Sequence, residues 1–189
     1  MEDTCISSSL FIISGPSASG KNTVLNIVLD ACKDSIRAIT HTTRAPRSNE
    51  KNGVDYYFVT SEEFDALVSE GKMIESNCYD GNCYGLSRAE LARVMSLGIK
   101  NVFAILDVNG ERNVKIEYPD AISIFILPPS IEELKSRIEG RKENTSDEIK
   151  ERMAVAENEI SESERYDYRL VNVDKDDCAR EVLGIISKH

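Results

Sequence analysis

Residues 15–22 of the chain, Gly-Pro-Ser-Ala-Ser-Gly-Lys-Asn, have the spacing of a phosphate-binding loop. Glycine lets the backbone turn so that successive N–H groups face inward and hold phosphate oxygens at the start of a helix. The lysine after the second glycine is then placed to neutralise the β and γ phosphates of a nucleotide. The motif predicts a donor nucleotide site, and its expected residues are Gly15, Pro16, Ser17, Ala18, Ser19, Gly20, Lys21, Asn22 and Thr23.

The position after the lysine departs from this motif, which has Ser or Thr there to bind Mg²⁺ through a hydroxyl. This chain has Asn22 at that position, and Thr23 follows one residue late. Because an Asn amide oxygen can also bind Mg²⁺, Asn22 is the candidate metal ligand.

Two arginines lie in the short segment 42–47, Thr-Thr-Arg-Ala-Pro-Arg. Arg44 and Arg47 could hold a phosphate dianion between two guanidinium groups, and Tyr56 and Tyr84 could add neutral O–H donors. Each of these residues taken alone is equally consistent with a solvated surface charge or with core packing. Downstream of a phosphate-binding loop, together they favour an acceptor that already carries a phosphate.

Three further arginines flank the polar stretch 142–146, which lacks apolar periodicity. Arg137, Arg141 and Arg152 could therefore belong to a mobile lid that brings positive charge to a phosphoryl group during its transfer.

The elements that must position these residues follow from the apolar pattern. Strands alternate with helices, which predicts an α/β fold with a central parallel sheet flanked by helices, and the polar region 40–85 interrupts this alternation as an inserted lobe. Strands are expected at 10–14, 36–40, 56–59, 102–108, 122–127 and 169–173, and a hairpin at 73–84. Helices are expected at 21–32, 87–97, 130–140, 147–165 and 176–187, and one more begins near residue 61.

The composition fits a soluble globular chain of 189 residues, with 41% hydrophobic and 30% charged residues. A net charge of −10 argues against general nucleic-acid binding. The acidic first residues and the short apolar runs indicate neither a secretory signal nor a membrane span. The five cysteines are odd in number and scattered, so we expect reduced thiols, no zinc site and a cytoplasmic location.

The order of several motifs resembles the guanylate kinase family from about residue 8 to 187. These motifs are GPSASGKNT, THTTRAPRSNEKNGVDYYFV, GKMIESNCYDGNCYGLSR, ILDVNG, IFILPPSIEELKSRIEGR and YDYRLVNVD. The resemblance implies one P-loop NTPase-like domain with a GMP-binding lobe at about 40–85 and a lid at about 137–165. Its core would comprise residues 1–39, 86–136 and 166–189.

The resemblance also implies the reaction of ATP with GMP or dGMP, assisted by Mg²⁺, and the role of each matched residue. Glu75 would accept hydrogen bonds from the guanine edge, and Asn172 would lie beside the adenine of ATP. The GMP-binding set would be Thr40, Arg44, Arg47, Tyr56, Glu75, Tyr84, Ser87 and Asp107. The catalytic set would be Lys21, Arg44, Arg137, Arg141 and Arg152.

Four positions depart from the family pattern. Ala18 and Lys142 stand where glycine is usual, Asn22 replaces serine, and Leu86 replaces a hydroxyl residue that contacts the base, although Ser87 could substitute for it. Two alternatives remain open: a protein-binding module of guanylate-kinase-like fold, and a kinase of similar architecture that uses another acceptor, such as a ribose bisphosphate.

Overall fold

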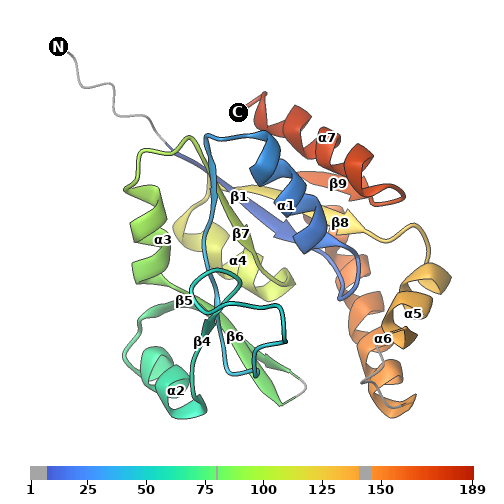
Figure 1. Ribbon diagram of the computed structural model, residues 1–189, viewed down its shortest axis with the longest axis horizontal. Coiled ribbons are helices and arrows are strands. Elements are labelled where there is room, and N and C mark those ends of the chain that lie inside the picture. The colour runs from blue at the N-terminus through green and yellow to red at the C-terminus, as the bar shows by residue number, and fades with distance from the viewer. Residues whose placement is uncertain (1–7, 80, 141–145) are drawn as a thin grey trace. The chain divides into compact units, whose positions relative to one another are not determined.

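The computed structural model describes residues 8–79, 81–140 and 146–189 (Figure 1). The chain divides into two compact units. The first unit comprises the chain up to Phe11 together with Asp34–Ala121. The second unit comprises Ile12–Lys33 together with Ile122–His189. Strand β1 (Ser9–Ser14) begins in the first unit and ends in the second.

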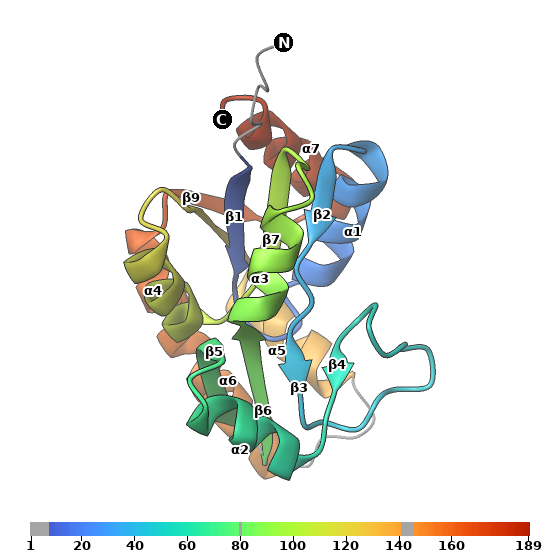
Figure 2. The ribbon, with the colours of Figure 1, turned by 90° about the vertical axis from the view of Figure 1, so that its left-hand side faces the viewer.

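The first unit contains most of the strands. Its elements are β2 (Ser35–Arg37), β3 (His41–Thr42), β4 (Tyr57–Phe58), α2 (Ser61–Ser69), β5 (Met73–Tyr79), β6 (Asn82–Ser87), α3 (Arg88–Met95), β7 (Asn101–Ile105) and α4 (Val108–Glu117). Strands β5 and β6 form an antiparallel hairpin, which belongs to a sheet of order β4-β3-β6-β5. Figure 2 shows α2 beside this hairpin, with which it is in contact.

Polar side chains fix the starts of three helices in the first unit. Thr60 and Glu63 form a reciprocal capping box at the start of α2. Ser87 caps α3, and the Asp107 carboxylate caps α4 by accepting hydrogen bonds from the amides of Asn109 and Gly110 at 3.0 and 2.7 Å. The last residues of β6 and the segment after β7 are thereby held in defined orientations.

The second unit is mainly helical. Its elements are α1 (Lys21–Ala31), β8 (Ile122–Leu127), α5 (Ile131–Glu139), α6 (Ser146–Ser161), a short 3-10 helix η1 (Glu162–Arg165), β9 (Tyr168–Val171) and α7 (Lys175–Ile186). Helix α1 packs against α7, and α5 packs against α6 around Leu134, Ile138 and Ala156 (Figure 1).

The central sheet has the order β2-β7-β1-β8-β9. Strand β2 pairs in parallel with β7, and β8 pairs in parallel with β9. Residues 11–13 of β1 and residues 124–126 of β8 are fully buried, which is typical of parallel strands covered on both faces. The predicted α/β fold with a central parallel sheet is therefore confirmed.

Most predicted elements are present, but three expectations were wrong. The run 102–108 is not one strand, because β7 ends at Ile105 and the Asp107 cap starts α4, a helix that the apolar pattern did not predict. The strand expected at 36–40 ends at Arg37. Cys78 and Cys83 are joined in a disulfide, whereas Cys32 and Cys178 are thiols and Cys5 lies outside the described residues. Within the described ranges, no helix is long and apolar enough to cross a membrane.

Candidate active site

The phosphate-binding loop connects β1 to α1 in the second unit, as its spacing predicted. Its two glycines are required by geometry: Gly15 has φ 144°, and a Cβ there would lie 2.3 Å from the carbonyl oxygen of Ile126. Gly20 has φ 94° and stands at the N-cap of α1, where no side chain caps the helix. The first amides of α1 are thus presented to a phosphate without a competing side chain.

Lys21 begins α1, and its ammonium lies over this loop. Its Nζ donates hydrogen bonds to the carbonyl oxygens of Gly15 and Pro16 at 2.5 and 2.8 Å. The loop therefore places one positive charge beside the start of a helix, a combination that favours binding of nucleotide phosphates. Asn22 and Thr23, in the first turn of the same helix, are both exposed.

Asn172, directly after β9, supports the far side of the loop. Its buried side chain donates from Nδ2 to the carbonyl oxygen of Ser19 at 2.7 Å. A Cβ at Gly20 would lie 2.3 Å from the same Nδ2 atom, so the asparagine and the glycine fit only as a pair. A contact of Asn172 with the donor base stays a prediction.

Ala18 has the only positive φ, 66°, among the described non-glycine residues. An L-residue in this left-handed region costs roughly 1–2 kcal/mol, which gives a physical reason why glycine is usual there. The Ala18 side chain packs against the cluster between α5 and α6. Alanine in place of glycine at position 18 therefore strains the loop, but its methyl group packs the loop against α5 and α6.

The arginines expected in the lid have different surroundings. Arg137 on α5 pairs with Glu133, one turn earlier, with 2.9 Å between Nε and Oε1. Arg152 is half-buried on α6. Arg141 and Lys142 lie outside the described residues, so their predicted roles concern a part of the chain of which nothing is described here.

The predicted phosphate clamp lies in the first unit. The guanidinium carbon of Arg44 lies 5.6 Å from the centre of the Tyr56 ring, and the rings of Tyr56 and Tyr84 meet edge to face at 6.2 Å. Arg37 lies over the same Tyr56 ring at 5.9 Å. Arg44, Tyr56 and Tyr84, distant in sequence, are thus gathered into one cationic and aromatic cluster.

Glu75 on β5 is a carboxyl group only 7% exposed. Burial raises its pKa to about 8, the nearby Asp107 carboxylate adds to the rise, and a backbone hydrogen bond involving Leu86 acts against it. A Cβ at Gly110 on α4 would lie 2.8 Å from Glu75 Oε2, so this helix approaches the carboxyl group closely because it has glycine there. Strongly shifted acids of this kind occur at functional sites.

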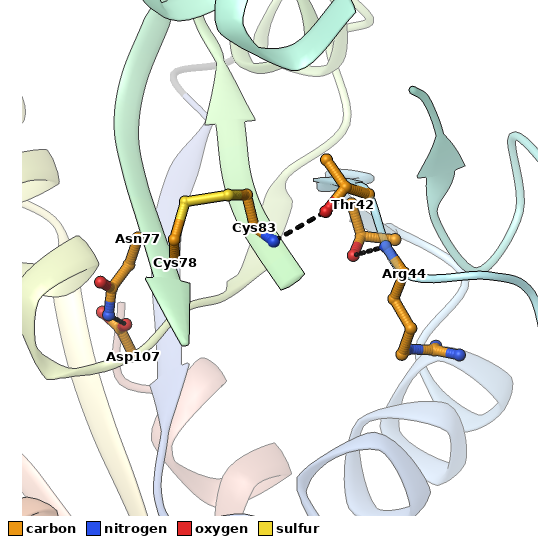
Figure 3. Close-up of a disulfide and its surroundings, with 7 residues drawn as sticks. Thr42, Arg44, Asn77, Cys78, Cys83 and Asp107 are labelled. Carbon is orange, nitrogen blue, oxygen red and sulfur yellow. Dashed lines mark hydrogen bonds between the residues drawn. A yellow bond between two sulfur atoms is a disulfide. The ribbon is translucent and has the colours of Figure 1, made fainter. Parts of the chain in front are cut away.

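The hairpin that carries Glu75 is braced on both sides of its disulfide (Figure 3). On one side, Asn77 Nδ2 donates to Asp107 Oδ2 at 2.6 Å. On the other side, the Cys83 amide donates to Thr43 Oγ1 at 2.8 Å, and the Thr43 amide donates back to the Cys83 carbonyl at 3.0 Å. The segment before Arg44 is therefore attached to the same hairpin as Glu75.

Comparison with known proteins shows the family of the chain. The sequence model of the family described as Guanylate kinase matches residues 7–189. The chain belongs to the guanylate kinase family. A guanylate kinase of Shewanella denitrificans is 42% identical over 94% of this chain and 86% of its own length. One from Francisella tularensis is 46% identical over 87% of this chain and 88% of its own. A crystal structure of guanylate kinase from Anaplasma phagocytophilum superposes with a TM-score of 0.78 at 33% identity, covering 97% and 86% of the two chains.

The residues predicted to bind GMP and those predicted to bind ATP fall into different units, whereas the predicted catalytic set draws Arg44 from the first unit and its other members from the second. Every predicted GMP-binding residue lies in the first unit, and every predicted donor residue lies in the second. Ser87, like Asp107, caps a helix: its Oγ accepts the Glu90 amide at 3.2 Å at the start of α3. Leu86 on β6 lies directly opposite Glu75 on β5, so the two side chains project from the same face of the sheet. A base contact by Ser87 stays a prediction.

Sequence reasoning missed three residues that support the guanylate kinase site. Asn77 holds Asp107, Gly110 admits Glu75, and Glu50 binds Arg44. Asn77 lies two residues after Glu75, and this spacing puts both on one face of a strand. Glu50 lies three residues after Arg47 and is the acid nearest in sequence to the two predicted clamp arginines. Its negative charge could therefore have indicated an ion pair with one of them.

Proposed function

We propose that this protein phosphorylates GMP to GDP, and dGMP more weakly, with ATP as the phosphoryl donor. Membership of the guanylate kinase family supports the reaction, and the chain is an enzyme of the nucleoside monophosphate kinase class. The observation that carries the acceptor assignment is the buried Glu75 carboxyl in the same unit as the cluster of Arg44, Tyr56 and Tyr84. One group suits a guanine edge, and the other suits a phosphate.

Glu75 would recognise guanine by accepting hydrogen bonds from N1–H and the 2-amino group. Adenine has no such pair of donors, so it would leave the buried Glu75 carboxyl group without its hydrogen-bond partners, which is costly. Arg44, Arg47, Tyr56 and Tyr84 would hold the acceptor phosphate through charged and neutral donors. Thr40, which is buried, and Asp107 would line the rest of the acceptor site.

The second unit would hold ATP. The loop amides and Lys21 would bind its phosphates, while Arg137, Arg141 and Arg152 would stabilise charge on the group in transfer. The acceptor phosphate is already an anion, so no general base is needed, and catalysis would consist of alignment and charge neutralisation. A lid at about residues 137–165 would exclude water, which would otherwise hydrolyse ATP.

Mg²⁺ is the metal we propose for this reaction. No group of three or more His, Cys, Asp or Glu side chains that could hold a metal occurs in the described part of the chain. That fits Mg²⁺, which is usually bound by phosphates, waters and one or two protein oxygens. The exposed Asn22 amide could supply one such oxygen. When bound, Mg²⁺ would neutralise charge on the β and γ phosphates.

We further propose a cytoplasmic enzyme without nucleic-acid or membrane partners, organised as the core, GMP-binding lobe and lid that the sequence predicted. The net charge of −10 supports the absence of nucleic-acid partners.

The test of the function is a substrate panel. Purified protein with ATP and Mg²⁺ is assayed for ADP release with GMP, dGMP, AMP, CMP, UMP and no acceptor. We expect rapid turnover of GMP, weaker turnover of dGMP and hardly any of the others. Comparable turnover of AMP and GMP would show that Glu75 does not select the base.

A further inference from the structure

Glu50 is engaged with both arginines of the predicted phosphate clamp. Its two carboxylate oxygens accept hydrogen bonds from Arg44 Nη2 at 2.8 and 2.9 Å. Oε2 also accepts the Arg47 backbone amide at 2.8 Å, and the Glu50 amide donates to the Arg47 carbonyl at 3.0 Å. One carboxylate therefore fixes the side chain of one clamp residue and the backbone of the other.

The surroundings of the Arg44–Glu50 pair favour a defined geometry. The side chains of Arg44 and Glu50 are only 17% and 13% exposed, unlike that of Arg47 at 51%. Arg44 Nη1 donates to the Ala45 carbonyl at 2.7 Å, and the Tyr56 ring lies beneath the guanidinium. Burial would raise the pKa of Glu50, but hydrogen bonds from the Arg47 amide and Arg44 outweigh burial and hold it below its usual value. Glu50 is thus charged at neutral pH.

We propose that Glu50 is a positioning residue for the acceptor phosphate: it holds Arg44 and the Arg47 backbone in the geometry that binds GMP. This inference rests on the proposed function of the clamp. A flexible arginine loses rotamer freedom when it is fixed, and Glu50 fixes it before the substrate arrives. Preorganisation of this kind strengthens binding by lowering the cost of ordering.

The opposing effect is repulsion between Glu50 and the phosphate dianion. Both oxygens of the Glu50 carboxylate accept hydrogen bonds from Arg44 Nη2. The positive guanidinium therefore partly neutralises the negative charge of the carboxylate. Glutamine would keep one acceptor but turn an N–H₂ group toward the guanidinium or the Arg47 amide, both of which are donors. Loss of orientation at two clamp residues is therefore expected to exceed the relief of repulsion.

The test compares Glu50→Gln and Glu50→Asp with Glu117→Gln, all in the full-length protein. Glu117 is a matched control, because it pairs with Arg88 in the same unit but away from the clamp. Initial rates give kcat and KM for GMP and KM for ATP, and competition gives Ki for guanosine, which lacks the phosphate. Thermal unfolding checks that each variant is folded.

We expect Glu50→Gln to raise the KM for GMP about tenfold or more, with Ki for guanosine and KM for ATP unchanged. Glu50→Asp, which keeps the charge, should recover part of this loss, and Glu117→Gln should match wild type. An unchanged KM for GMP would overturn the proposal, and a lowered one would show that the carboxylate competes with the phosphate. Arg44→Ala separates the two levels: if its KM for GMP is normal, the clamp itself is misassigned.

Discussion

The two units build their sites from different parts of the chain. In the first unit, the predicted acceptor site consists of side chains that other side chains hold: Glu50 binds Arg44, and Asn77 binds Asp107. In the second unit, the phosphate loop depends on backbone geometry, with positive φ at Gly15 and Gly20. Recognition of a particular base needs specific side chains, whereas binding of a phosphate chain needs mainly oriented amides.

This difference explains how far each site could be predicted from sequence. A backbone site is contiguous, so the spacing of Gly15, Gly20 and Lys21 predicted the loop, and the apolar pattern beside it predicted the strand and the helix. The acceptor site gathers residues from 37 to 110, and their proximity depends on sheet register that no local pattern encodes. Glu75 and Asp107 were therefore assigned through family resemblance.

Two of the wrong predictions have separate causes. Cys78 and Cys83 lie directly opposite each other in the hairpin. They are five residues apart in sequence, and the turn of the hairpin lies between them. The hairpin was predicted, but the odd number and scatter of the five cysteines led to the expectation of reduced thiols. Helix α4 was missed because Val108 continued an apolar run, although Asp107 is a typical N-cap residue.

If the donor site works independently of acceptor binding, Lys21→Ala should have the largest and most selective effect. We expect kcat to fall about a thousandfold, because the lysine stabilises charge on the transferring group. The dissociation constant of GMP should stay near wild type. Steady-state kinetics and GMP titration test this, with the exposed Lys33→Ala of the same unit as control. A similar loss of GMP affinity would mean that the two sites are not separable.

Glu75→Gln tests the converse in the first unit. The amide would keep one acceptor but turn a donor toward a guanine donor, and this mismatch should lower kcat/KM for GMP roughly a hundred- to a thousandfold. The KM for ATP should stay within about twofold, since the donor site is built from other residues. Near-normal GMP kinetics would reduce Glu75 to a structural acid.

The same substitution should change how stability depends on pH. The pKa of Glu75 is raised from 4.5 to about 8 in the folded protein, so the folded state binds the proton more tightly than the unfolded chain does. Its stabilising contribution is complete below pH 4.5 and is lost as the pH rises toward 8. Each pKa unit corresponds to about 1.4 kcal/mol, so Glu75→Gln should gain a few kcal/mol relative to wild type between pH 5 and 9. Denaturant unfolding at both pH values measures this, and parallel pH curves would contradict the raised pKa.

The disulfide should make a smaller contribution, confined to the first unit. It closes a short loop, and for such loops the chain-entropy estimate is about 2 kcal/mol. Adding dithiothreitol should therefore lower the free energy of unfolding by about this amount and slightly weaken GMP binding through the Cys83–Thr43 contacts, with ATP binding unchanged. The double variant Cys78→Ser/Cys83→Ser should be insensitive to the reductant. If wild type is equally insensitive, these cysteines are not paired in solution.

The smallest expected effect concerns Asn22. It is the one side chain that we propose as a metal ligand in a donor site otherwise formed mainly by the backbone. Serine after the lysine would supply a compact hydroxyl at about 2.1 Å from Mg²⁺, whereas Asn22 carries its oxygen one atom further out with an extra torsion. Thr23 cannot replace it, because successive residues on a helix point about 100° apart. Asn22→Ser should therefore lower the Mg²⁺ concentration for half-maximal activity by a few-fold, roughly 1 kcal/mol, and leave the KM for GMP unchanged. Activity titrations with Mg²⁺ and with Mn²⁺ measure the change, and Thr23→Ser is the matched control. We expect wild type to tolerate Mn²⁺ better than the serine variant does. An equal or weaker Mg²⁺ response in Asn22→Ser would show that Asn22 is either a competent ligand or none at all. If it is no ligand, the second unit would bind its metal through the nucleotide phosphates, and the donor site would depend on backbone rather than side chains more completely than proposed.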